Sequence, residues 1–162
     1  MTIAELTRKM INFYKGNKPS VSHTMKVWGY AKTIGELEGL DEDTQFLTEV
    51  AAIVHDLSIP FCREKYGDDC GSLQEKEGPA ITVEFLADTG LSEDAVERLA
   101  YLVGHHHSPE QIDGIDYQIL IEADYLVNAD EWGYSDEDIR MYHDKIFKTA
   151  SGTSMLEDIF MA

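Results

Sequence analysis

Basic residues, long apolar runs and cysteines are all scarce in this chain of 162 residues. Lysine and arginine number 13 against 31 aspartates and glutamates, and the resulting formal net charge of −18 argues against a phosphate backbone or an anionic membrane as partner. No apolar run approaches the roughly 20 residues that span a bilayer, and residues 1–15 resemble an amphipathic helix more than a cleavable signal. We therefore expect a cytoplasmic protein that binds neither nucleic acid nor membranes.

The sequence also lacks the alternating pattern of β-strands, and its apolar residues recur at helical spacing instead. Segments GLDED, GLSED and YSDED each place Asp or Ser at a helix N-cap with carboxylates in the first turn, which accounts for much of the negative charge. The spacing predicts helices over about 20–38, 42–56, 79–89, 93–106 and 115–129. We predict an all-α fold that forms one compact helical bundle over residues 1–162.

Within this bundle the core motif should cover about residues 20–130, with C-terminal helices over 135–162 packed on it. The stretch from Ser58 to Gly78 interrupts the helical pattern with glycines, a proline and mixed charges. Loops of this length in compact domains usually cover a functional site or move. We therefore expect a long loop that roofs whatever lies beneath it. Its two cysteines, Cys62 and Cys70, are best explained as ordinary thiols, with a disulfide as the alternative.

His55 and Asp56 stand side by side at the end of an apolar helix, in the segment AAIVHDLSIP. His23 lies on the inward stripe of the preceding helix, and Asp124 lies within an apolar stripe later in the chain. A single inward histidine is more often a hydrogen-bonded core residue than a ligand, and a single helical aspartate is more often a cap. Four such groups facing one interior favour a metal site, because a buried charge has to be paired or metal-bound. Two imidazoles and two carboxylates suit Mn, Fe, Co, Ni or Zn.

The order of these residues resembles the HD-domain superfamily of metal-dependent phosphohydrolases over roughly residues 20–130. SHTMKVWGYAKTI is similar to the first-ligand helix of that family, AAIVHDLSIP to its His-Asp signature, and EADYLVNAD to its closing aspartate segment. The resemblance implies an HD-type helical bundle in which His23, His55, Asp56 and Asp124 hold a divalent transition metal. It also implies hydrolysis of a small phosphate ester or anhydride, such as a nucleotide.

One branch of this superfamily binds a second metal through further histidines between the His-Asp pair and the last aspartate. The segment LVGHHHS offers three consecutive candidates, of which His106 fits the apolar stripe best and His105 is the second choice. Where the branch has another histidine, this chain has Glu77, which serves either as an oxygen ligand or as a carboxylate at a helix N-terminus. The resemblance therefore leaves open one metal or two.

Asp56 is the expected catalytic residue, because it could hold a metal and either bridge two metals or, in a site with one metal, orient the attacking water with its free oxygen. Lys145 and Lys148, in the segment DKIFKTASGT, are the candidates for binding substrate phosphate. Arg63 and Lys65 in the expected loop are further candidates, although solvated surface lysines are common. The excess of negative charge favours a small phosphorylated substrate over a polyanion.

Two other functions fit the same residues. HD-type diiron oxygenases resemble this arrangement of ligands but cleave C–C or C–P bonds with dioxygen. A metal-binding or ligand-sensing module without turnover is the other alternative. We favour hydrolysis, because every core ligand type is present. A homodimer is a further expectation, since the two ends of the chain, residues 1–15 and 153–162, are amphipathic.

Overall fold

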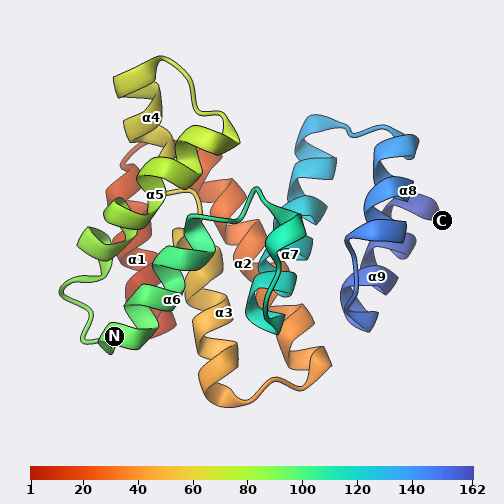
Figure 1. The fold of residues 1–162 in the computed structure, drawn as a ribbon, viewed down its shortest axis with the longest axis horizontal. Helices are drawn as coiled ribbons and strands as arrows, with labels where there is room; N and C mark the ends of the chain where they lie inside the picture. The colour runs from red at the N-terminus through yellow and green to blue at the C-terminus, as the bar shows by residue number, and fades with distance from the viewer.

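The computed structural model describes all residues from Met1 to Ala162, and it contains helices and no strands (Figure 1). The α-helices are α1 (Ile3–Tyr14), α2 (Lys18–Glu38), α3 (Glu42–Val54), α4 (Ile59–Tyr66), α5 (Gly71–Leu86), α6 (Glu93–Val103), α7 (Ile115–Trp132), α8 (Asp136–Lys145) and α9 (Ala150–Leu156). A 3-10 turn, η1 (Pro109–Gln111), precedes α7, and a π-helical turn, η2 (Glu157–Met161), follows α9. The prediction of an all-α fold is therefore confirmed.

Polar side chains fix the starts of three helices. Asp41, Ser92 and Ser135 are the N-cap residues of α3, α6 and α8, and each accepts a hydrogen bond from a backbone N–H in the first turn. Acidic residues follow each cap, where the positive end of the helix dipole stabilises them. These are the three segments in which the sequence predicted capping.

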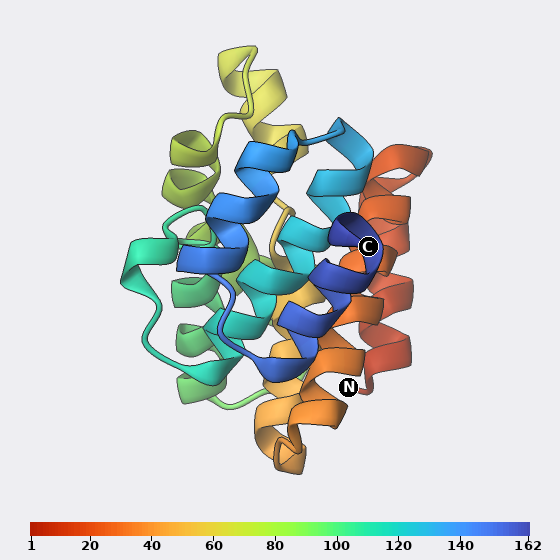
Figure 2. The same ribbon diagram turned by 90° about the vertical axis from the view of Figure 1, so that its right-hand side faces the viewer.

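Three helices form the centre of the bundle and position the site. α2 packs along both α3 and α7, and α3 also packs against α7 and α6 (Figure 1). The C-terminal helix α9 lies on α2 and α7, and Figure 2 shows α8 and α9 in front of α7 in that view. One contiguous set of buried apolar side chains runs from Leu6 on α1 to Leu156 on α9.

Residues 58–78 do not form the expected loop. They contain α4, which ends where Gly67 adopts the left-handed conformation, and the first half of α5. The helix predicted over 79–89 thus begins at Gly71, because the glycine-proline pair lies inside α5 and does not start it. A Cβ atom on Gly78 would lie 2.6 Å from Val103 Cγ1, so this glycine permits close packing of α5 on α6.

The apolar stripe of the N-terminal helix is covered by its own chain. Leu6, Met10 and Tyr14 of α1 are buried, and α1 packs on α3. None of the helices combines the length and the apolar character that crossing a membrane requires.

Candidate metal centre

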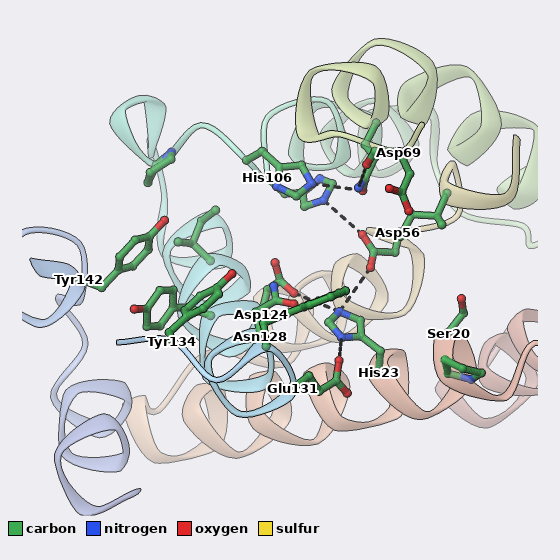
Figure 3. Close-up of a pocket in the computed structure, with 18 of the residues that line it drawn as sticks. Ser20, His23, Asp56, Asp69, His106, Asp124, Asn128, Glu131, Tyr134 and Tyr142 are labelled. Atoms are coloured by element: carbon green, nitrogen blue, oxygen red, sulfur yellow. Dashed lines mark hydrogen bonds and ion pairs between the residues drawn. The ribbon is translucent and has the colours of Figure 1, made fainter. Parts of the chain in front are cut away.

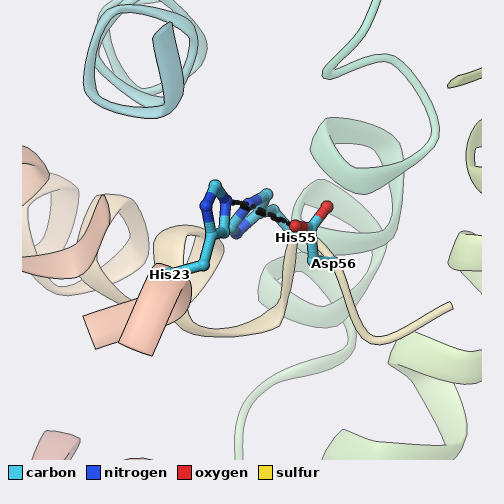
Figure 4. A group of neighbouring side chains, drawn as sticks. All are labelled: His23, His55 and Asp56. Carbon is cyan, nitrogen blue, oxygen red and sulfur yellow. Dashed lines mark hydrogen bonds and ion pairs between the residues drawn. The ribbon is translucent and has the colours of Figure 1, made fainter. Parts of the chain in front are cut away.

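Four side chains from the three central helices meet at one point. His23 projects from α2, His55 and Asp56 follow directly on α3, and Asp124 projects from α7 (Figure 4 shows the first three). The His55 side chain is fully buried, whereas the other three side chains are 12–13% exposed. The chain leaves α3 after Val54 and turns before α4, and this turn presents both members of the His-Asp pair to the same interior.

The ligand atoms of these residues are close together. His23 Nε2 and His55 Nε2 lie 3.3 Å apart. Asp124 Oδ1 lies 3.1 Å from the first nitrogen and 3.6 Å from the second. Asp56 Oδ2 lies 3.3 Å and 3.2 Å from the same two nitrogens. Each histidine nitrogen therefore faces the other and two carboxylate oxygens.

Hydrogen bonds at the far side of each ring set its tautomer. His55 Nδ1–H donates to the carbonyl oxygen of Ala52 at 2.8 Å. His23 Nδ1–H donates to Glu131 Oε2 at 2.9 Å, and the other oxygen of Glu131 accepts from Lys26 Nζ at 3.1 Å. A neutral imidazole that carries its proton on Nδ1 has its lone pair on Nε2. Both neutral rings would therefore direct a lone pair into the cluster.

This donor set fits a metal ion. When the two rings are neutral, only lone pairs and carboxylate oxygens meet at the centre, and they repel one another unless a cation lies between them. Ligand bonds of about 2.0–2.2 Å would separate neighbouring ligand atoms by about 3.0–3.5 Å. The distances of 3.1–3.6 Å in the cluster agree with this spacing. The four residues could hold a divalent transition metal.

The charges of the cluster shift the pKa of its members when no metal is bound. Burial lowers the pKa of His55, but the charges and hydrogen bonds of Asp56 and Asp124 outweigh burial and hold this pKa well above its ordinary value. Burial raises the pKa of Asp124, yet hydrogen bonds from His23 and His55 bring this pKa well below its ordinary range. Protons on the histidines can thus take the place of a metal as the compensating positive charge.

A second group of ligand atoms surrounds the other oxygen of Asp56. Its Oδ1 lies 3.5 Å from His106 Nε2. Figure 3 marks this pair with a dashed line. A ring nitrogen of His107 lies within 4.8 Å of ligand atoms of both Asp56 and His106. His106 Nδ1–H donates to the carbonyl oxygen of Val103 at 2.8 Å, whereas His106 Nε2 is buried without a hydrogen-bond partner. Because an unpaired buried polar atom is costly, this nitrogen also fits the role of a metal ligand.

His105 does not join either group. Its Nδ1–H donates to the carbonyl oxygen of Tyr101 at 2.7 Å, and its ring stacks on the ring of Tyr101. α6 ends at Val103, so helical spacing no longer predicts the direction of the side chains that follow. His107, which the sequence offered as one of three consecutive candidates, faces Asp56 where we expected His105 as the second choice.

Glu77 also lies away from the cluster. Its carboxylate accepts hydrogen bonds from Lys65 Nζ at 3.0 Å and from the Tyr66 hydroxyl, both on α4. Gln74, almost one turn earlier on α5, lines the pocket instead, and its Oε1 lies 3.2 Å from His107 Nε2. We placed Glu77 at a helix start, but it lies in the middle of α5, where its carboxylate is directed to α4.

Lys145 and Lys148 are exposed and do not line the pocket. The backbone N–H of Lys148 donates to Glu122 Oε1 at 2.7 Å. Glu122 lies two residues before Asp124 on α7, which places it about 200° around the helix from the cluster. The segment that carries the two lysines therefore packs on the face of α7 that is directed away from the cluster, where it cannot reach a substrate bound there.

A cavity of about 400 Å³ opens over both groups of ligand atoms (Figure 3). Arg63 of α4 is the one lysine or arginine in its lining. Its Nε and Nη2 donate to Asp69 Oδ2 at 2.7 Å and 2.6 Å. The remaining wall includes four aromatic residues, Tyr125, Trp132, Tyr134 and Tyr142.

Sequence reasoning missed several of these residues. Glu131 and Asn128 follow Asp124 by seven and four residues, which places all three on one face of α7, and this spacing could have identified them. Gln74 and Tyr142 gave no comparable signal, because their positions depend on how α5 and α8 pack.

Comparison with known proteins agrees with this architecture. A family model of the HD domain matches residues 21–130. The fold is similar to the crystal structure of a predicted HD superfamily hydrolase from an uncultured Thermotogales bacterium, with a TM-score of 0.71. The two sequences are 22% identical, and the match covers 98% of this chain and 84% of that chain. No curated protein matches the sequence. Because the family model spans most of the chain and all the clustered histidines and aspartates, the chain belongs to the HD-domain family.

Proposed function

We propose that the protein is a metal-dependent phosphohydrolase that acts on a small phosphate ester or anhydride, such as a nucleotide. The observation that carries this proposal is the position of Asp56 between two sets of metal-ligand atoms at the cavity. Its Oδ2 faces His23 and His55, and its Oδ1 faces His106. A carboxylate shared in this way is suited to a pair of metal ions that act together on one phosphoryl group.

The residues of the first group, His23, His55, Asp56 and Asp124, would hold one divalent transition metal. His106 and His107 would hold a second together with Asp56. When bound, such metals polarise phosphoryl oxygens and lower the pKa of a water ligand from 15.7 to about 7. The ring hydrogen bonds to Ala52, Glu131 and Val103 would keep the three ligating histidines in the required tautomer.

Two further side chains would act on the substrate directly. In a site with one metal, Asp56 Oδ1 would stay free at the cavity and could accept a hydrogen bond from the attacking water and so orient it. The Arg63 guanidinium already donates two of its N–H groups to Asp69, which holds the plane of the guanidinium at the pocket rim. Its remaining N–H groups could bind a phosphoryl oxygen. Arg63 thus replaces Lys145 and Lys148 as the phosphate-binding residue that we propose.

The charge of the pocket limits how many negative charges a substrate can carry. Asp69 offsets the charge of Arg63, and the chain as a whole carries a formal −18. Long-range repulsion would therefore disfavour a polyanion, so the proposed substrate is small and carries few phosphates.

The test is to reconstitute the protein with Mn, Fe, Co, Ni or Zn and to measure bound metal and release of nitrophenol from para-nitrophenyl phosphate and its diester. Asp56→Ala should abolish hydrolysis and lower the metal content. His143→Ala is the control, because His143 lies on α8 outside the pocket and pairs with Asp144 and Glu157. Equal losses in the two variants would contradict the assignment.

The same preparations separate the two alternative functions. Oxygen uptake by the iron-loaded protein without phosphate release would indicate an oxygenase. Tight metal binding without any product from a panel of phosphate esters would indicate a silent binding module. Either result would refute the hydrolase proposal.

A further inference from the structure

His107 lies in the turn after α6 and is held at three points by the start of α5. Its backbone N–H donates to Glu75 Oε1 at 3.0 Å, and its ring nitrogen Nε2 lies 3.2 Å from Gln74 Oε1. The backbone of Gly71 packs against the ring, since a Cβ atom on this glycine would lie 2.8 Å from His107 Cγ. The first residues of α5 therefore fix the position of the His107 ring.

The side-chain amide of Gln74 can face His107 in only one orientation. Gln74 Nε2 donates to the carbonyl oxygen of Asp69 at 2.7 Å, and a carbonyl oxygen can only accept. Exchanging the nitrogen and oxygen of the amide would bring two acceptors together at this distance. The atom that faces His107 is thus the amide oxygen. Because this oxygen can only accept as well, His107 Nε2 carries the proton and donates it.

This tautomer of His107 is opposite to that of the other histidines in the two groups of ligand atoms. Those rings donate from Nδ1 and keep a lone pair on Nε2; they are His23, His55 and His106. A neutral His107 that carries its proton on Nε2 has its lone pair on Nδ1. The hydrogen bond to Gln74 engages Nε2 alone, so Nδ1 is left as the free nitrogen of the ring.

We propose that Gln74 fixes this tautomer of His107 and thereby makes Nδ1 the nitrogen that His107 offers to a metal ion beside Asp56 and His106. Gln74 is then a positioning residue, because it acts on the ion through His107. Partners of this kind orient the ring and raise metal affinity. In the opposite tautomer a proton would occupy Nδ1, and this nitrogen could not bind an ion. The inference rests on the proposed function, because the ion is the second metal of that proposal.

Three variants separate the acceptor atom of Gln74 from its other contacts, and Zn²⁺ affinity is measured by competition with a chromophoric chelator. Gln74→Met removes donor and acceptor at similar size, so the second ion should bind about 10–100-fold more weakly and the first ion unchanged. Gln74→Glu keeps an acceptor but loses the donor to Asp69, so it should bind the second ion at least as tightly as the wild type. Gln111→Met is the matched control, because Gln111 is exposed in η1 and does not line the pocket; it should change neither ion.

A second measurement observes the tautomer directly. Long-range proton–nitrogen NMR spectra of the Zn²⁺-loaded protein, labelled with ¹⁵N-histidine, show which nitrogen of each ring carries a proton. His107 should carry it on Nε2, whereas His106 should carry it on Nδ1. His107→Gln identifies the signals of this ring. In Gln74→Met the Nε2 proton of His107 should no longer be protected from exchange, while the His106 signals should persist.

Several results would overturn the inference. They are a proton on His107 Nδ1, a single ion bound by the wild type, an unchanged second-ion affinity in Gln74→Met, and equal losses in Gln74→Met and Gln74→Glu. Equal weakening of both ions in Gln74→Met would overturn it as well, because it would show a general structural role.

None of these readouts requires turnover, so failure of the inference and failure of the proposed function are distinguishable. Two bound ions with the expected tautomers, but no hydrolysis of any phosphate ester, would support the role of Gln74 and refute the phosphohydrolase. Metal-dependent hydrolysis by a protein whose second-ion affinity does not respond to Gln74→Met would support the phosphohydrolase and refute the role of Gln74.

Discussion

Replacing Glu131 with glutamine tests whether a residue that does not itself join the ligand cluster controls metal affinity. Glu131 Oε2 accepts the Nδ1–H of His23 at 2.9 Å, and its other oxygen accepts from Lys26. The hydrogen bond fixes the tautomer that leaves His23 Nε2 free for a metal, and the negative charge makes that nitrogen more basic. Glutamine keeps the size and one acceptor but removes the charge.

The expected effect can be bounded. Loss of such an outer partner typically weakens metal binding about 10–100-fold, which is about 1.4–2.7 kcal/mol. Glu131→Gln should lie near the lower limit, because the amide oxygen can still accept from Nδ1–H. Glu131→Ala should lie near the upper limit, because it removes both the acceptor and the charge.

The assay is competition for metal with a chromophoric chelator. Asp130→Asn is the matched control, since it changes the net charge equally at the neighbouring, exposed position. It should leave the dissociation constant unchanged. Equal weakening in Asp130→Asn and Glu131→Gln would show a general charge effect and would refute the role of the hydrogen bond. An unchanged affinity in Glu131→Ala would refute it as well.

Three further predictions follow from the structure. His106→Ala should remove about one metal equivalent per chain by elemental analysis, whereas His105→Ala should remove none; the reverse order would contradict the second group of ligands. The raised pKa of His55 means that its charge stabilises the metal-free fold below about pH 6.5 and that this stabilisation is lost as pH rises through the folded pKa. Because metal displaces that proton, the increase in Tm on adding metal should grow with pH, and a constant increase would count against the site. Gly78→Ala should lower the unfolding free energy by about 1–3 kcal/mol in denaturant titrations, because its Cβ would meet the buried Val103 side chain at 2.6 Å. A gain in stability, as alanine usually gives in a helix, would refute this packing argument.

Local patterns in the sequence were sufficient to predict which residues meet in the central part of the site. His23 and Asp124 lie on apolar stripes, and a helix packed in a bundle directs such a stripe inward. His55 and Asp56 end an apolar helix, where both can reach the interior as the chain turns. The N-caps at Asp41 and Ser92 were equally predictable, because capping depends only on neighbouring residues.

Where the structure departs from expectation, long-range packing decided the outcome. Glycine next to proline usually marks a helix boundary, but the contact between Gly78 and Val103 requires glycine inside α5. The direction of the His105 side chain depended on where α6 ends. The helix stops at Val103, two residues before His105, and sequence patterns do not predict a helix end to within one residue. The pocket also brings Tyr125 of α7 beside Tyr142 of α8, and no local pattern specifies how those two helices face each other.

The acidic character of the chain affects how the pocket could retain a phosphate ester. A phosphate-binding protein that relies on a basic surface attracts its substrate at long range, whereas this pocket offers only Arg63, whose charge Asp69 already offsets. Affinity for a phosphate ester would therefore have to arise at short range, from metal held by Asp56 and its neighbours and from contacts that carry no charge. Contacts without charge do not weaken under physiological salt. In a chain of net charge −18, short-range contacts are thus the more effective way to retain a small phosphorylated substrate.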